Sequence, residues 1–216
     1  MSSEHAPRAP YRQPQQARSA ATLARVLQAA EAVASAVGLD EMTISGVAER
    51  AGVSVGTIYR RFEDKEQLIN ALTERMLDRR EEYVAEQLSQ AAPSLSGVMD
   101  AYAHALLQSF ADSTSLFPAL LRARGAHPTD RGARAITAIH RLLLEAAAPY
   151  AGEIRRSDPQ GALDTAARAV LGACFHNSVR PDPATGEAAQ RRYANELSDM
   201  AIAYLLTPDK RGTSRT

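Results

Sequence analysis

Apolar residues recur at steps of three and four along most of the chain, which is the spacing of one face of an α-helix. In the first such stretch, from about residue 18 to Gly38, the apolar face carries Leu23, Val26, Leu27, Ala30, Val33, Ala34 and Val37. Similar stretches continue to residue 207, and none shows a convincing strand pattern. The pattern therefore predicts an all-α protein of about nine helices.

Capping residues and a glycine divide the first third of the chain. Thr43 and Ser54 each precede a short apolar stretch and are expected N-caps, while Gly52 separates the two stretches. Asp64 begins a fourth helix, and Gln67 three residues later completes a capping box. No proline interrupts this helix, so we expect it to continue to about residue 90.

The pattern beyond Pro93 stays helical and becomes more apolar. We expect helices that contain residues 98–110, 116–121, 136–147, 163–174 and 193–205. Loops should join them at 125–132, 149–159 and 180–186, where prolines and glycines gather.

Composition favours a helical protein of the cytoplasm. The 216 residues are 45% hydrophobic but only 5% aromatic, and Cys174 is the single cysteine, so no intramolecular disulfide can form. We read no apolar run as approaching the roughly 18 residues that span a bilayer, and the polar N-terminus does not resemble a secretory signal. We expect a cytoplasmic protein without a membrane partner.

The charge distribution leaves the partner open. The chain has 25 basic and 25 acidic residues, so its net charge gives no support to nucleic-acid binding. Arg8, Arg12, Arg18 and Arg25, however, lie in a segment without acidic residues. The segment is either a solvated, disordered leader or an arm that touches phosphates.

Two short predicted helices, at residues 43–51 and 55–61, flank a turn at Gly52. Their lengths are typical of a helix-turn-helix. Gly56 in the first turn of the second helix costs about 1 kcal/mol relative to alanine, which makes sense if a DNA backbone or base edge comes close. The hydroxyls of Ser54 and Thr57 at the helix N-terminus suit phosphate. Further donors follow at Tyr59, Arg60 and Lys65.

The segment TISGVAERAGVSVGTIYRRFEDKEQL, residues 43–68, resembles the DNA-binding signature of the TetR family of bacterial transcriptional regulators. The matching positions are Thr43, Ile44, Val47, Ala48, Ala51, Gly52, Val53, Ser54, Gly56, Thr57, Tyr59, Phe62, Lys65 and Leu68. Many matches in one register make the signal specific. The helices that follow carry no motif.

The resemblance implies a role for each exposed position. Phosphates would be held by Thr43, Ser54, Thr57, Tyr59 and Lys65, and base edges in the major groove would be met by Val55, Gly56 and Arg60. Arginine can pair with guanine through two hydrogen bonds, whereas valine offers only an apolar contact, for example with a thymine methyl. Many relatives carry a polar residue in place of Val55. Alternatively, the two hydroxyls only cap and the tyrosine only packs.

The resemblance also implies a homodimer on operator DNA. It predicts a disordered arm at 1–17, a helix-turn-helix domain at 18–66, a helical effector-binding and dimerisation domain at 67–207 and a flexible tail at 208–216. The last two long helices would form the dimer surface through small residues and two bulky ones, namely Ala166, Ala169, Val170, Ala173, Met200 and Tyr204. Alternatively, these helices only close the core of each monomer.

The middle helices would hold an unidentified small-molecule effector. The expected lining residues are Tyr102, Phe110, Phe117, His140, Phe175, His176 and Asn177, although aromatic residues at helical spacing are often core instead. We expect the effector to release a repressor from its operator, with the fourth helix as the lever. A transcriptional activator and a ligand-independent regulator of the same fold are the alternatives.

Catalytic signals are absent from the sequence. There is no phosphate-binding glycine loop, no GxSxG and no CxxC, and no HxxxH lies near a carboxylate. We interpret Cys174 as a buried small hydrophobic residue. We expect no enzyme, no cofactor and no metal site.

Overall fold

The computed structural model describes residues 13–111, 130–179 and 186–209. These residues form eight α-helices and one 3-10 helix, and no strand is found among them. The predicted all-α fold is confirmed. The expected helix at 116–121, with Phe117, lies outside the described residues. The chain divides into two compact units, Met1–Leu72 and Thr73–Thr216, which are treated separately below.

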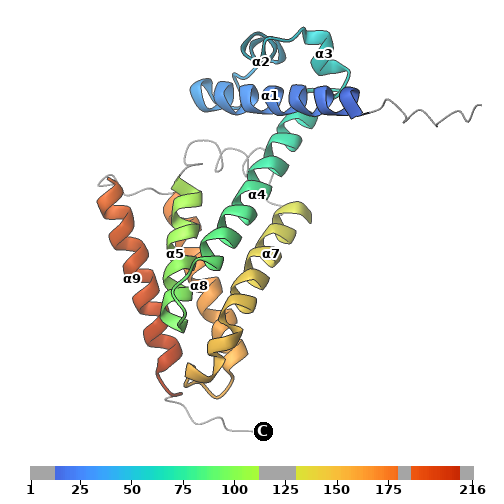
Figure 1. Cartoon of the computed structure of the whole chain (residues 1–216). Helices are drawn as coiled ribbons and strands as arrows, with labels where there is room; N and C mark the ends of the chain where they lie inside the picture. The colour runs from blue at the N-terminus through green and yellow to red at the C-terminus, as the bar shows by residue number, and fades with distance from the viewer. Residues whose placement is uncertain (1–12, 112–129, 180–185, 210–216) are drawn as a thin grey trace, which may run out of the picture. The chain divides into compact units, whose positions relative to one another are not determined.

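The first unit contains three helices and the start of a fourth (Figure 1). They are α1 (Gln13–Val37), α2 (Ile44–Ala51), α3 (Val55–Tyr59) and the first turns of α4 (Lys65–Ser89). Helix α1 packs closely on α2, and α2 on α3. Their inward faces form a small core of Val26, Leu27, Ala30, Val47, Ala48, Ile58 and Leu68.

Helix α1 differs from its expected extent at one end only. It begins at Gln13, so residues 13–17, which we expected in a disordered arm, are helical. Proline in the first helical turn loses no intrahelical hydrogen bond, and the glutamines and alanine that follow are good helix formers. At the other end α1 stops at Val37 as expected, and Gly38 adopts the left-handed φ of 87°.

Part of α1 corrects the expectation about apolar runs. By length and composition alone, Ser19–Val37 is long and apolar enough to cross a membrane. This segment includes Arg25 and Glu31, and its buried residues pack within the first unit. A core helix of a soluble domain passes the same test, so we treat the segment as weak support for a membrane span.

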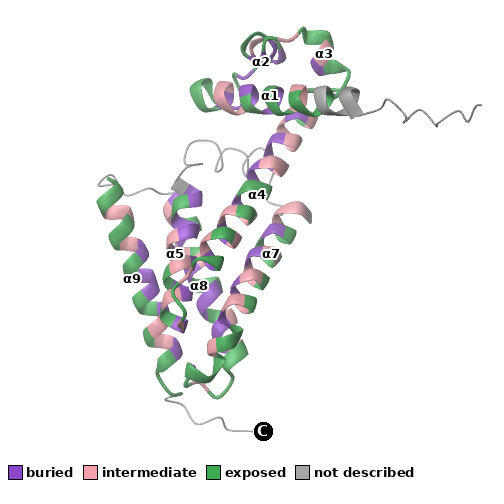
Figure 2. Cartoon of the chain, viewed as in Figure 1, coloured by how far each residue is buried: buried purple, intermediate pink, exposed green. Residues whose placement is uncertain are grey.

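The second unit is built around α5, with three further helices and a short 3-10 helix (Figure 1). Its elements beyond α4 are α5 (Leu95–Ala111), α7 (Asp130–Ala147), η1 (Ala148–Glu153), α8 (Pro159–Val179) and α9 (Glu187–Leu206). The most extensive packing within this unit joins α5 with α9, α8 with α9 and α5 with α8. Figure 2 shows buried residues along most of α5. The most buried of these are Leu95, Met99, Tyr102, Ala103, Ala105 and Leu106.

Helix α7 begins earlier than expected and exposes one of its apolar residues. We expected a loop to residue 132, but the helix starts at Asp130. Ile136, the first apolar residue of the expected helix at 136–147, is 53% exposed. The buried stripe runs through Ala135, Ile139, Leu143 and Ala147. Because neighbouring residues differ by about 100° around a helix, Ile136 lies beside this stripe.

Candidate nucleic-acid interface

Two side-chain caps fix the starts of α2 and α3. Thr43 Oγ1 accepts a hydrogen bond from the backbone N–H of Gly46 at 3.1 Å. Ser54 Oγ accepts one from the N–H of Thr57 at 3.2 Å. Each bond satisfies a donor that the first turn of a helix leaves without a helical partner. Both predicted N-caps are therefore confirmed.

The turn between α2 and α3 depends on one glycine. Gly52 has φ 63° and ψ 40°, which is the left-handed conformation. Its N–H bonds to the carbonyl of Glu49 at 3.1 Å, and the N–H of Val53 bonds to the carbonyl of Ala48 at 3.0 Å. This pair of bonds is the Schellman motif that commonly ends a helix. A Cβ on Gly52 would meet no atom within 4 Å, so the requirement for glycine lies in the backbone angle.

Helix α3 is anchored by one residue and exposes its leading end. Ile58 is fully buried, whereas Ser54, Val55 and Gly56 are exposed, as Figure 2 shows for the N-terminal side of the helix. The nearest atom to a Cβ on Gly56 would be Ser54 Oγ at 3.9 Å, an ordinary contact. The protein itself therefore does not require glycine at this position, which leaves room for a molecule that approaches from outside.

A short chain of hydrogen bonds runs along the exposed face of α3. The hydroxyls of Ser54 and Thr57 lie 2.9 Å apart, and Arg60 Nη2 donates to Thr57 Oγ1 at 3.1 Å. Tyr59 is 53% exposed beside them. This chain places two hydroxyls and one guanidinium together on a surface where phosphate or a base edge can accept hydrogen bonds.

The two adjacent arginines have different surroundings. Arg60 stays on the exposed face, while Arg61 Nη2 donates to the backbone carbonyl of Ser19 in α1 at 2.9 Å and also contacts the Ser19 hydroxyl. Arg61 thus ties the end of α3 to the first helix. The sequence pattern could not distinguish Arg61 from Arg60, because Ser19 lies 42 residues away along the chain.

Asp64 caps the start of α4 as expected, but Gln67 returns its bond to Glu63 instead of Asp64, so the predicted capping box forms only in part. The lysine of this turn has a partner within the unit. The N–H of Gln67 donates to Asp64 Oδ1 at 2.8 Å, and the Gln67 side chain accepts from the N–H of Glu63 at 3.0 Å. Lys65 Nζ donates to the carbonyl of Asp40 at 2.8 Å and is half-buried. A phosphate contact by Lys65 would have to compete with that bond or share the ammonium group. Phe62 is buried, which agrees with a packing role.

The expected effector residues divide between core and surface. Tyr102 is buried, and its hydroxyl donates to the carbonyl of Ala167 at 3.4 Å. Phe110 is also buried and meets Phe175 edge to face, with 6.3 Å between ring centres. Phe175 is 42% exposed. These contacts link α5 with α8.

The polar members of the expected set do not gather at one place. His140 Nε2 lies 3.0 Å from Asp164 Oδ1, which connects α7 with α8. His176 is exposed and Asn177 is half-buried. The seven-residue set, of which Phe117 is not described, stays a prediction.

Burial shifts the pKa of several side chains in the second unit, among them Arg80, Cys174 and Tyr102. Burial lowers the pKa of Arg80 to about 10, although its guanidinium lies 4.2 Å from the ring centre of Phe110 and donates to the carbonyl of Ser109 at 3.2 Å. Burial raises the pKa of Cys174 to about 12 and also raises that of Tyr102. A thiol with this pKa is a poor nucleophile at neutral pH.

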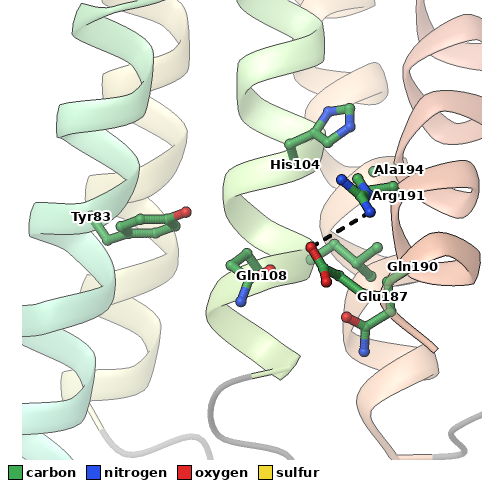
Figure 3. A pocket seen from close by; sticks show the side chains of 8 residues that line it. Tyr83, His104, Gln108, Glu187, Gln190, Arg191 and Ala194 are labelled. Carbon is green, nitrogen blue, oxygen red and sulfur yellow. Dashed lines mark ion pairs between the residues drawn. The ribbon is translucent and has the colours of Figure 1, made fainter. Parts of the chain in front are cut away.

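A cleft of about 430 Å³ opens between α4, α5 and α9 (Figure 3). Its volume lies within the range of small-molecule sites. The lining combines apolar and polar side chains, namely Tyr83, His104, Leu107, Gln108, Glu187, Gln190, Arg191 and Ala194. None of these residues is in the expected effector set. The polar pair His104 and Gln108, four residues apart on a mainly apolar helix, is a signal that points to this face.

The polar groups of the cleft are partly oriented by the protein. His104 Nδ1 lies 2.9 Å from the carbonyl of Asp100. Because a carbonyl only accepts, Nδ1 carries the proton, and a neutral ring then offers Nε2 as an acceptor. Arg191 Nη2 lies 3.6 Å from Glu187 Oε1, as the dashed line in Figure 3 marks. The cleft therefore offers both donors and acceptors beside an apolar wall.

An exposed short helix behind a capped turn defines the class of the protein as a helix-turn-helix DNA-binding regulator. Residues 26–72 match the family model for bacterial regulatory proteins of the tetR family. The HTH-type transcriptional regulator YvdT of Bacillus subtilis, itself uncharacterized, is 43% identical over 53 residues. That match spans 24% of this chain and about a quarter, 27%, of YvdT. Residues 26–72 therefore carry a DNA-binding domain of the tetR type.

Solved structures agree with this assignment at the level of fold. A TetR-family transcriptional regulator from Streptomyces coelicolor is 24% identical, with a TM-score of 0.57, and the match covers 86% of this chain and 99% of that one. SmeT, the repressor of the Stenotrophomonas maltophilia multidrug efflux pump SmeDEF, is 22% identical with a TM-score of 0.56. Here the match covers 86% of this chain and 90% of SmeT.

Proposed function

We propose that this protein is a transcriptional repressor that binds operator DNA through α3 and is released by a small molecule. The observation that carries the proposal is the exposed leading end of α3, where Ser54, Val55 and Gly56 face solvent. Arg60, the C-cap residue of the same helix, can read guanine, while the hydroxyls of Ser54 and Thr57 can hold phosphate. Thr43, Tyr59 and Lys65 are proposed as further phosphate contacts.

The proposed active form is a homodimer that reads two half-sites about 34–36 Å apart. Helices α8 and α9 are its proposed interface. Ala169 is exposed on α8, and Met200 is 51% exposed on α9. A small residue and a large flexible one on neighbouring helices suit close helix packing between two copies. Other residues of the expected dimer surface, such as Ala166 and Val170 on α8, are already buried in the monomer.

The proposed effector is a small molecule that binds in the second unit. The cleft between α4, α5 and α9 is a candidate site besides the expected residues of the middle helices. Regulation requires that the molecule prefers one arrangement of the dimer over another, because only a difference in affinity shifts the populations. Helix α4 runs unbroken from Lys65 to Ser89 and enters both units, which supports its proposed role as the lever.

Repression rather than activation is favoured by one comparison. SmeT, which shares the fold, is a repressor. An activator or a ligand-independent regulator would use the same α3 surface, so the choice depends on the response of bound DNA to small molecules. We propose that the protein acts in the cytoplasm, where its operator DNA would lie.

Selection of bound duplexes from a random pool, with the full-length protein, tests the proposal. We expect an inverted repeat whose half-sites lie about one DNA turn apart. A screen of small molecules against that duplex should then find compounds that release it. Failure to enrich any duplex would overturn the DNA-binding proposal, and an enriched site without symmetry would overturn the dimer.

A further inference from the structure

Helix α4 is held in the second unit mainly through side chains. Among the described residues, α4 makes fewer close backbone approaches than α5, α8 and α9 make with one another. Its inward face buries Met76, Leu77, Val84 and Leu88, and Arg80 reaches the Ser109 carbonyl of α5. A helix that is held mainly by side-chain contacts can shift more easily than a helix whose backbone packs closely on its neighbours. The polar links of α4 therefore matter for its position.

One arginine of α7 makes the most extensive of these links. Arg131 Nε bonds to Glu74 Oε2 at 3.0 Å and Arg131 Nη1 to Glu81 Oε1 at 2.5 Å. Arg131 Nη2 also bonds to Asp78 Oδ1. All three acids belong to α4, and the arginine side chain is only 11% exposed. Each nitrogen of one guanidinium therefore holds a different carboxylate.

The spacing of the three carboxylates explains why one side chain suffices. Glu74, Asp78 and Glu81 follow each other at four and three residues, which places them on one helix face over a length of about 10 Å. The bonds to Glu81 and Asp78 raise the pKa of Arg131, although its burial acts in the opposite direction. Without the arginine, three like charges would face the same space and would repel one another.

We propose that Arg131 is a positioning residue that fixes α4 on α7 and thereby sets the half-site spacing that the dimer accepts. The inference rests on the proposed function, because spacing has meaning only for a dimer on two half-sites. Helix α4 continues into the unit that carries α3. A firmly held α4 restricts the separations that two recognition helices can adopt, whereas a loosened α4 permits a broader range.

The test compares Arg131→Gln with the wild-type protein on the selected operator and on duplexes whose spacer is one base pair longer or shorter. Each change moves a half-site by about 3.4 Å. We expect the wild type to prefer the selected spacing and the variant to lose about threefold or more of that preference. A loss of stability alone would lower the affinity for all three duplexes together. An unchanged preference would overturn the proposal.

Arg141→Gln is the matched control. Arg141 lies on the same helix and pairs with Glu145 at 2.8 Å, but that pair is exposed and stays within α7. Its replacement should leave the spacing preference unchanged. Glu81→Gln removes one partner of Arg131 and serves as a milder variant if Arg131→Gln does not fold. It should reduce the preference in the same direction.

Amide hydrogen exchange on the DNA-free protein separates this inference from the proposed function. Arg131→Gln should speed exchange in α4 from residue 74 to Ser89 more than in α5 or α9, because α4 loses its link to α7 whereas α5 and α9 lose none. If the wild type binds no duplex, the proposed function fails, while equal exchange in α4 of both proteins would by itself overturn the positioning role of Arg131.

Discussion

The two units use their polar side chains in different ways. In the first unit, Ser54, Thr57 and Arg60 form a bonded row that faces solvent. In the second unit, Arg131 and His140 hold carboxylates of neighbouring helices. The first unit therefore leaves this row of polar groups exposed to solvent, whereas the second unit mainly uses polar groups to join helices. Substitutions of exposed residues should therefore test the function of the first unit. Substitutions of buried residues should have the largest effect on the stability of the second unit.

The largest expected effect comes from the core of the second unit. Leu106→Ala should lower the free energy of unfolding by about 2–5 kcal/mol, because the leucine is fully buried on α5 and its removal leaves a cavity. Urea unfolding measures the change. The matched control is Leu206→Ala, where the leucine is 39% exposed, and it should change stability by less than about 1 kcal/mol. Equal effects would contradict the central position of α5.

The second prediction concerns recognition by the first unit. Arg60→Ala should reduce the discrimination between operator and mutated operator by about 1–3 kcal/mol, because one bidentate base contact is lost. Tyr59→Phe should instead weaken all duplexes to a similar extent, since a phosphate contact carries no sequence information. Competition gel shifts measure both. If the two variants behave alike, the proposed division between base and phosphate contacts is wrong.

The turn that presents α3 should be sensitive to backbone angle alone. Gly52→Ala should destabilise the protein by about 1–2 kcal/mol, because a left-handed φ is strained for alanine even where space is free. Gly152→Ala is the control, since Gly152 also has no atom near its would-be Cβ but does not have a positive φ. It should have less than half the effect in thermal unfolding. If Gly52→Ala leaves the stability unchanged, the turn tolerates another conformation.

Local signals in the sequence predicted the fold of the first unit well. The caps at Thr43 and Ser54 and the break at Gly52 are confirmed, because each depends on atoms within a few residues. Helix α7 shows the limit. Glycine and proline before residue 132 indicated a loop, yet the helix starts at Asp130 and Arg131 finds its partners 50 to 57 residues away. Bonds over such distances leave no periodic trace in the sequence.

The two candidate sites also differ in whether they depend on local signals or on contacts between distant parts of the chain. The residues proposed to bind DNA lie on one short motif, and the structure exposes Val55, Gly56 and Arg60 as the motif led us to expect; their contacts with DNA stay a prediction. The effector residues could not be chosen with the same certainty, because helical spacing alone does not separate a core aromatic residue from one that lines a cleft. Tyr102 is buried, whereas the described cleft uses polar residues of α9 that meet α4 and α5 only after folding.

The smallest expected effect on stability tests whether the Ser54 hydroxyl only caps α3 or also meets DNA. Ser54→Ala removes the cap and should lower the free energy of unfolding by about 1 kcal/mol. Ser54→Asp keeps a good N-cap and should change stability by less than about 0.5 kcal/mol. The same aspartate would place a negative charge beside phosphate, so it should weaken operator binding more than alanine does. Urea unfolding and gel shifts on both variants give the comparison, and if operator affinity simply follows stability, Ser54 acts as a cap alone.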